Sequence, residues 1–295
     1  MTQAVKAEDV NHALKAALWM TGAIVSFSTM AVAGRFVRVE LDTFELMLYR
    51  SLVGVVIVLL VGGMAGTLGQ ITRRRMRLQL VRNISHFTGQ NLWFYAITAI
   101  PLAQVFALEF TAPLWVALLA PLLVGERMTP TRALAAALGF AGILIVARPD
   151  PANLEAGALA ALGAAIGFAG SALFTKRLTR TETITCILFW LTVMQAAFGV
   201  ICAGIDGQIA LPSPAAWPAL VVIGCAGLFA HFCLTTALSI APASIVMPLD
   251  FLRLPVIAIV GMALYGEPLE VLVFVGGAII FAANVINLRA ERRPR

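Results

Sequence analysis

Residues 101–126 read PLAQVFALEFTAPLWVALLAPLLVGE, and residues 242–267 read PASIVMPLDFLRLPVIAIVGMALYGE. A shift of 141 residues aligns the two stretches without a gap. Each begins with proline, carries an acidic residue followed by phenylalanine about a third of the way along, and ends in Gly-Glu. A shift of 142 aligns the R-x-x-R-x-E motif of residues 35–40 with that of residues 177–182. Several matches at a nearly constant offset indicate an internal duplication.

The composition places most of this chain in lipid. Of its 295 residues, 60% are hydrophobic and only 12% are charged, and the mean hydropathy is +0.92. A soluble domain carries roughly 25% charged residues, so this chain has too little polar surface to coat a water-facing globule. The net charge of +6 does not indicate nucleic-acid binding, because the arginines lie between apolar runs and not along one polar face.

Apolar segments long enough to cross a bilayer fill the chain. A span needs about 20 mostly apolar residues, and the sequence predicts ten. They cover residues 13–34, 43–63, 78–99, 102–123, 131–148, 156–175, 184–204, 216–238, 243–264 and 270–288. The linkers between them are too short to hold a soluble domain. We expect two units, a first five-helix repeat over residues 1–150 and a second over residues 151–295.

The Lys and Arg residues predict the orientation in the membrane. With the N-terminus in the cytoplasm, 16 of the 21 Lys and Arg residues fall on the cytoplasmic side and three outside, while Arg50 and Arg253 lie within spans. Cytoplasmic loops of membrane proteins carry the excess of positive charge. We therefore expect a multi-pass protein of the bacterial inner membrane with both termini in the cytoplasm.

The odd number of spans in each unit predicts an inverted repeat. After five crossings, the second unit enters the bilayer from the opposite side, so the two halves are related by a pseudo-two-fold axis in the membrane plane. This is the design of many secondary transporters, which expose a central site to each side in turn. The expected fold is thus all-α, with ten transmembrane helices arranged as two inverted five-helix repeats around a central cavity.

Specific motifs add a family resemblance to this interpretation. The run GQNLWFYA at residues 89–96, followed by Pro-Leu-Ala at 101–103, Pro113 and Gly-Glu at 125–126, resembles the pattern of the EamA family of the drug/metabolite transporter superfamily. The second half repeats it loosely with Ala237, Pro-Ala-Ser at 242–244, Pro255 and Gly-Glu at 266–267. The resemblance implies a ten-helix inner-membrane carrier of amino acids, other metabolites or drug-like cations, often moving them outward, as the aromatic amino acid exporter type does.

Ionisable residues within spans are the first candidates for the transport site, because a charge at a helix centre costs about 2.5–3.5 kcal/mol on insertion scales. Glu109 lies about 10 Å along its span at 1.5 Å per residue, and the repeat places Asp250 at the mirrored depth. We expect the two acids to flank a cavity that binds a substrate ammonium or a coupling proton. Alternatively, Asp250 simply pairs with Arg253, three residues on, and Arg253 could equally hold a substrate carboxylate.

Residues of the third and eighth spans are weaker candidates. An unperturbed histidine titrates near neutral pH, so His86 and His231 would suit proton coupling, although a histidine bonded to a backbone carbonyl is the simpler alternative. Gln90, the repeat partner of His231, and Trp93 are expected to line the same cavity. Arg50 has no partner at good spacing on its own helix, and Glu109 is the candidate partner from another helix.

Other features indicate structural roles. Glu126 and Glu267 each end a span, and we expect each to accept N–H groups at the start of the next helix. Pro113, Pro248 and Pro255 lie within spans and predict kinks, with or without a hinge function. The four cysteines lack metal-ligand spacing, so no metal and no cofactor is expected.

The sequence as a whole favours a secondary transporter. Mixed charges in the core suit a zwitterion, so amino acids are the preferred substrate, and the family resemblance favours their export. Import or export of another metabolite or of drug-like cations is the alternative. A membrane enzyme is the alternative of a different class, but the chain has no H-E-x-x-H, G-x-S-x-G or P-loop motif. The expected partners are a small-molecule substrate, the lipid bilayer and a coupling proton if transport is driven, with a monomer or weak dimer as the assembly.

Overall fold

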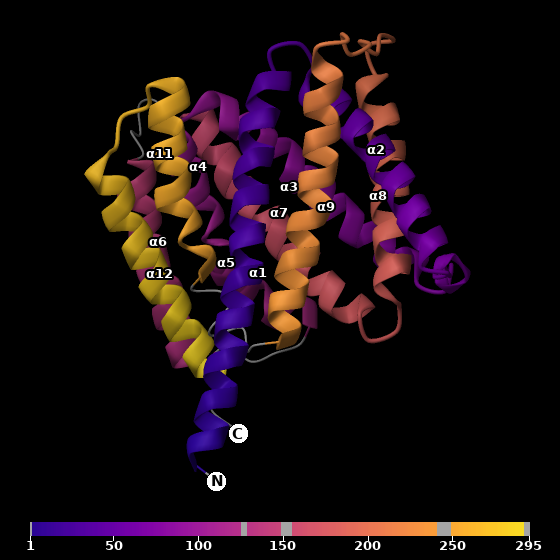
Figure 1. Cartoon of the computed structure of the whole chain (residues 1–295). Helices are drawn as coiled ribbons and strands as arrows, with labels where there is room; N and C mark the ends of the chain where they lie inside the picture. The colour runs from indigo at the N-terminus through magenta and orange to yellow at the C-terminus, as the bar shows by residue number, and fades with distance from the viewer. Residues whose placement is uncertain (1, 125–128, 149–154, 241–248, 292–295) are drawn as a thin grey trace.

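The computed structural model describes residues 2–124, 129–148, 155–240 and 249–291, and within these ranges the regular structure is entirely helical. The helices run antiparallel in a bundle (Figure 1). Their bounds are α1 Thr2–Val37, α2 Thr43–Met64, η1 Leu68–Gln70, α3 Met76–Ala99, α4 Leu102–Glu109, α5 Ala112–Val124, α6 Pro130–Ala147, α7 Ala156–Leu178, α8 Ile184–Ala203, α9 Ala216–Ile240, α11 Arg253–Tyr265 and α12 Val271–Glu291.

These helices follow the predicted spans closely. Five of them are long and apolar enough to cross a membrane by length and composition: Leu14–Val37, Thr43–Met64, Ala156–Thr175, Ile184–Ala203 and Ala216–Leu234. Shorter apolar helices lie within α4–α5, α6, α11 and α12. The long helix α3 is absent from both groups because its polar residues lower its hydropathy, and many of them are buried within the bundle, as described below.

The fourth predicted span is not one continuous helix. It is divided at Phe110 and Thr111 into α4 and α5. Pro113 lies in the first turn of α5 and has no N–H to donate to the carbonyl of Glu109, so the helical bonding cannot continue through this point. In the second half, α11 begins just after Phe251, and Pro255 lies in its first turn. Pro248 lies outside the described residues.

Each close helix pair joins the two halves of the chain. α1 packs on α9, α3 on α7, α2 on α8 and α6 on α12. Figure 1 shows α1 and α9 side by side, and the start of α1 and the end of α12 at the same end of the bundle. Under the repeat shift of about 141 residues, α1 corresponds to α7 and α3 corresponds to α9. The α1–α9 pair in the structure is therefore equivalent to the α3–α7 pair.

Small residues permit the close approach of α3 and α7. A Cβ on Gly167 would lie 2.8 Å from the Gly89 Cα and 2.8 Å from the Ser85 carbonyl oxygen. Backbone packs on backbone here, which is how helices associate where lipid removes the hydrophobic driving force. This contact brings the polar residues of α3 next to the second half of the chain.

Hydrogen bonds hold one end of the α2–α8 pair together. They join the residues at the start of α2 to the residues that follow α8. Ala210 donates its N–H to Glu45 at 2.6 Å and accepts the Tyr49 hydroxyl at 2.8 Å. Ser213 donates both its N–H and its hydroxyl to Glu40. Glu45 also completes a capping box with Asp42 at this helix start.

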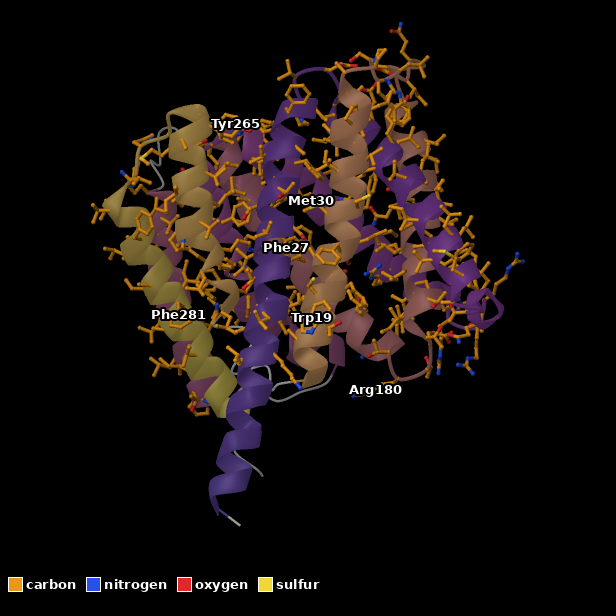
Figure 2. All side chains as sticks on the ribbon, in the orientation of Figure 1. Trp19, Phe27, Met30, Arg180, Tyr265 and Phe281 are labelled. Carbon is orange, nitrogen blue, oxygen red and sulfur yellow. The ribbon has the colours of Figure 1, made fainter. Side chains whose placement is uncertain are left out.

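A matching set of bonds fastens the opposite end of the same pair. Here the residues after α2 bond back to the start of α8. Thr72 donates its hydroxyl to Glu182 at 2.6 Å and accepts the Trp190 indole N–H at 2.7 Å, while its own N–H meets the Cys186 sulfur at 3.4 Å. Figure 2 shows Arg180, close to this set, and Tyr265 at opposite ends of the molecule.

Candidate functional site

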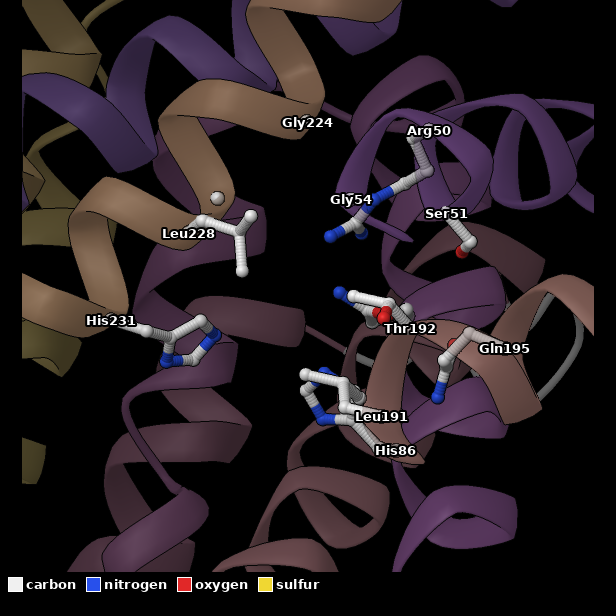
Figure 3. Close-up of a pocket in the computed structure, with 12 residues that line it drawn as sticks. Arg50, Ser51, Gly54, His86, Leu191, Thr192, Gln195, Gly224, Leu228 and His231 are labelled. Atoms are coloured by element: carbon white, nitrogen blue, oxygen red, sulfur yellow. The ribbon is translucent and has the colours of Figure 1, made fainter. Parts of the chain in front are cut away.

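A polar pocket lies between α2, α3, α8 and α9. In this conformation its cavity volume is about 30 Å³, which is room for one or two water molecules and well below the size of an open small-molecule site. In Figure 3, Arg50, His86 and His231 approach this space from three sides. The imidazole centres of His86 and His231 lie 6.2 Å apart. The complete lining is Arg50, Ser51, Gly54, His86, Gln90, Leu191, Thr192, Gln195, Gly224, Gly227, Leu228 and His231.

Helix α3 supplies a polar stripe that leads to this pocket. Gln79, Asn83, His86 and Gln90 recur at helical spacing and are all buried. From Gln79 to Gln90 the stripe runs about 16 Å at 1.5 Å per residue. Arg82 lies beside it, bonded to Thr175 and Asn83. The polar face of α3 therefore points into the protein, and its apolar residues are left for the remaining faces.

The pocket is electropositive. The Arg50 guanidinium lies 5.8 Å from the Phe94 ring centre and 3.7 Å from the Met47 sulfur. No carboxylate in the described part of the chain pairs with Arg50 or with buried Arg82. A charge removed from water is costly unless it is paired or hydrogen-bonded. Arg50 thus offers unused donors to a ligand that brings its own acceptors.

A second, charged cluster lies where α4 ends and α11 begins. Arg253 Nη2 is 2.9 Å from Asp250 Oδ2 and 3.5 Å from Glu109 Oε1, while the Trp93 indole N–H donates to Glu109 Oε2 at 2.8 Å. The Arg253 guanidinium also stands over the rings of Phe27, Phe106 and Phe110 at 4.6–5.0 Å. None of these residues lines the pocket.

Two aromatic bridges join the cluster to the pocket. Phe27 of α1 contacts Arg253 on one side and packs edge-on against His231 on the other, with ring centres 5.6 Å apart. Trp93 holds Glu109 and packs edge-on against Phe94 at 5.1 Å, and Phe94 lies under Arg50. A shift of Arg253 or Glu109 therefore reaches the pocket through a single ring or a ring pair.

The predicted site residues divide between the polar pocket and the charged cluster. Arg50, His86, Gln90 and His231 line the pocket, whereas Trp93, Glu109, Asp250 and Arg253 form the cluster. The i, i+3 pairing of Asp250 with Arg253 is confirmed. Neither histidine is held by a backbone carbonyl within the described chain; the His86 Nδ1 lies 3.4 Å from the Ser171 hydroxyl.

Two predicted contacts are wrong. Glu109 does not pair with Arg50, because it pairs with Arg253 at the start of α11 instead. Glu267 does cap a helix, but not the next one. It accepts the N–H of Leu102 at the start of α4 and pairs with Arg35, which also donates to the Ile97 and Ile100 carbonyls. Glu126 lies outside the described residues.

Sequence reasoning missed the contribution of α8. Thr192 and Gln195 line the pocket, and Gln195 is 2% exposed with its Oε1 unbonded within the described chain. Neither residue is charged, so neither stands out in an apolar run. The available signal was the repeat, since Ser51 and Gly54 are their equivalents under the 141-residue shift.

The apolar helices point to a multi-pass membrane protein, and comparison with known families identifies its class. The model of the EamA-like transporter family matches residues 14–148 and again residues 155–289. The chain therefore belongs to the EamA-like transporter family, whose members move small molecules across membranes.

Two named relatives and one solved structure are similar to this chain over most of its length. The chain is 34% identical over 218 residues to a protein of Brucella anthropi named riboflavin transporter, covering 72% of this chain and 77% of the relative. It is 25% identical to a Rickettsia prowazekii protein named S-adenosylmethionine uptake transporter, over 96% of this chain and 97% of the relative. A solved crystal structure with 21% identity covers 95% of this chain and 99% of its own, with a TM-score of 0.64, and shares the fold.

Proposed function

We propose that this protein takes up a neutral, carbonyl-rich heteroaromatic metabolite, with riboflavin as the first candidate. One observation carries the proposal: Arg50 points unpaired donors into a pocket that amides, hydroxyls and imidazoles complete. The isoalloxazine ring of a flavin presents two carbonyl oxygens and an imide N–H. These groups suit the Arg50 fork and the Gln90 or Gln195 amides, and the ribityl hydroxyls suit Ser51 and Thr192.

The charge of the pocket favours riboflavin over the other named or expected substrates. S-adenosylmethionine carries a sulfonium cation and drug-like cations carry a full positive charge, which Arg50 and Arg82 would repel. A zwitterionic amino acid needs a carboxylate in the protein for its ammonium. Glu109 and Asp250 do not line the pocket, and both already contact Arg253. Amino acid export is therefore the less favoured function.

The proposed mechanism is alternating access by two inverted halves. The exchange of the α1–α9 pair with the α3–α7 pair under the repeat supports this arrangement, and so does the double match of the family model. The division into units of residues 1–150 and 151–295 follows from it. The excess of Lys and Arg on one side supports an inner-membrane location with both termini in the cytoplasm.

Counterflow in liposomes tests the proposed function. Purified protein should exchange labelled riboflavin, and R50Q should lose about ten- to a hundredfold of this exchange, because a hydrogen bond to a charged group contributes about 1.5–3 kcal/mol. R50K keeps the charge but not the planar fork, and should recover only part of the activity. R180Q removes an exposed cation far from the pocket and is the matched control.

Two results would contradict the proposal. One is counterflow of phenylalanine or S-adenosylmethionine without any of riboflavin. The other is R50Q protein that is folded, shown by an unchanged elution profile, and exchanges riboflavin like the wild type.

A further inference from the structure

We propose that the Glu109–Arg253–Asp250 cluster is a proton-binding site that drives uptake through the neighbouring pocket. The inference rests on the proposed function for its transport readout, but the proton site itself is argued from the cluster alone. A proton enters with each substrate molecule, bound as the neutral acid of Glu109, and leaves on the other side of the membrane.

The charge balance of the cluster requires a titrating carboxyl group. Two carboxyls face a single guanidinium, so the fully ionised cluster carries one negative charge in excess. Asp250 is 8% exposed, and its Oδ1 has no partner in the described chain. A net charge enclosed among rings and apolar helices is unfavourable, and a carboxyl group relieves it by taking up a proton.

Glu109 is the carboxyl that takes the proton. Arg253 lies closer to Asp250, at 2.9 Å, than to Glu109, at 3.5 Å, so Asp250 is the better-stabilised anion. The Trp93 N–H bonds to one oxygen of Glu109 in either state and leaves the other oxygen for the proton. The titratable and charged groups facing Glu109 in the described chain are Asp250 and Arg253, with His231 of α9 beyond the Phe27 ring.

The position of the cluster explains how the proton would act on the substrate. Glu109 ends α4 and Arg253 begins α11, so the ion pair joins the two interrupted helices across the halves of the chain. The stacked rings of Phe110 and Phe251, 4.4 Å apart, join the same two breaks. Ionised Glu109 attracts Arg253 more strongly, and Phe27 transmits a shift of Arg253 to His231 in the pocket.

Transport driven by a pH gradient tests the coupling. Liposomes with an acidic exterior should accumulate riboflavin, and a gradient of about one pH unit should support about tenfold accumulation for one proton per substrate. E109Q should lose this accumulation and still exchange riboflavin at equal pH on both sides. E155Q removes an exposed carboxyl outside the cluster and serves as the matched control.

Infrared spectroscopy tests the proton site without any substrate. The wild type in nanodiscs should show a protonated-carboxyl band at neutral pH that disappears in E109Q and remains in E155Q. Absence of the band in the wild type, or its survival in E109Q, would overturn the proton site. Accumulation driven by a sodium gradient in place of a pH gradient would overturn the coupling. Complete lack of riboflavin counterflow would refute the proposed function alone, and the infrared result would still decide the site.

Discussion

Glu182 is a loop carboxylate whose neighbours fix its charge state. It lies between α7 and α8 and is 9% exposed. The Thr72 hydroxyl donates to it at 2.6 Å, and Arg74 pairs with it at 3.2 Å. The hydrogen bond from Thr72 is the main reason that the pKa of Glu182 lies below its ordinary 4.5; Arg74 adds to the effect, and burial opposes it. The ionised form thus holds the loop after α2 against α8.

This lowered pKa predicts how stability changes with pH. Because the folded protein holds the ionised form more firmly than the unfolded chain does, the contribution of Glu182 is complete above pH 4.5 and is lost as pH falls through the lower folded pKa. E182Q should lower the melting temperature at pH 7, and the difference from the wild type should shrink on acidification. Thermal unfolding in detergent from pH 7 to pH 4 measures this. E155Q should track the wild type, and a constant E182Q difference would contradict the explanation.

Residue-level prediction from sequence succeeded where the partners are close along the chain. The Asp250–Arg253 pair follows from its i, i+3 spacing, although the break before α11 lies between the two residues. The partners of Glu109 and Glu267 come from helices far along the chain, so spacing could not specify them. Thr192 and Gln195 went unnoticed because uncharged polar residues do not stand out in a transmembrane helix.

At the scale of single helices, α3 shows why hydropathy and function conflict. Its polar stripe lowers its hydropathy below that of the helices apolar enough to cross a membrane, and the same stripe leads to the pocket. The boundaries of most helices were predictable because apolar runs and prolines delimit them. The division of α4 from α5 was only indicated by Pro113, since proline predicts a disturbance and not whether the helix bends or ends.

The contact between α3 and α7 gives a prediction at this scale. G167A should destabilise the protein by about 1–3 kcal/mol, the usual penalty of overpacking, because the new methyl group would meet the backbone of Gly89 and Ser85 at 2.8 Å. G170A is the matched control on the same helix. Its methyl group would meet only the Ser85 side chain, at 3.3 Å or more, which can rotate away. Thermal unfolding in detergent compares the two, and equal melting temperatures would contradict the close contact.

At the scale of the whole molecule, the two ends of the α2–α8 pair are built alike. The 142-residue shift places Glu40 on Glu182, and the 141-residue shift places Glu45 on Cys186 and Tyr49 on Trp190. In the structure, the first of each pair binds the segment after α8 and the second binds the segment after α2. Equivalent residues thus hold opposite ends of one antiparallel pair. Such a pair is fastened at both ends at once, which suits a rigid support in the proposed alternating-access mechanism.

An inverted arrangement makes a sharp prediction about equivalent loop residues. Val39 and Thr181 are related by the 142-residue shift and are both exposed. If five crossings separate them, V39C should react with an impermeant thiol reagent in intact spheroplasts, whereas T181C should react only after the membrane is opened. The four native cysteines are first replaced by serine, and retained riboflavin counterflow confirms that the variants are folded. Labelling of both positions from the same side would refute the inversion. The reverse pattern would keep the inversion but place both termini outside the cytoplasm.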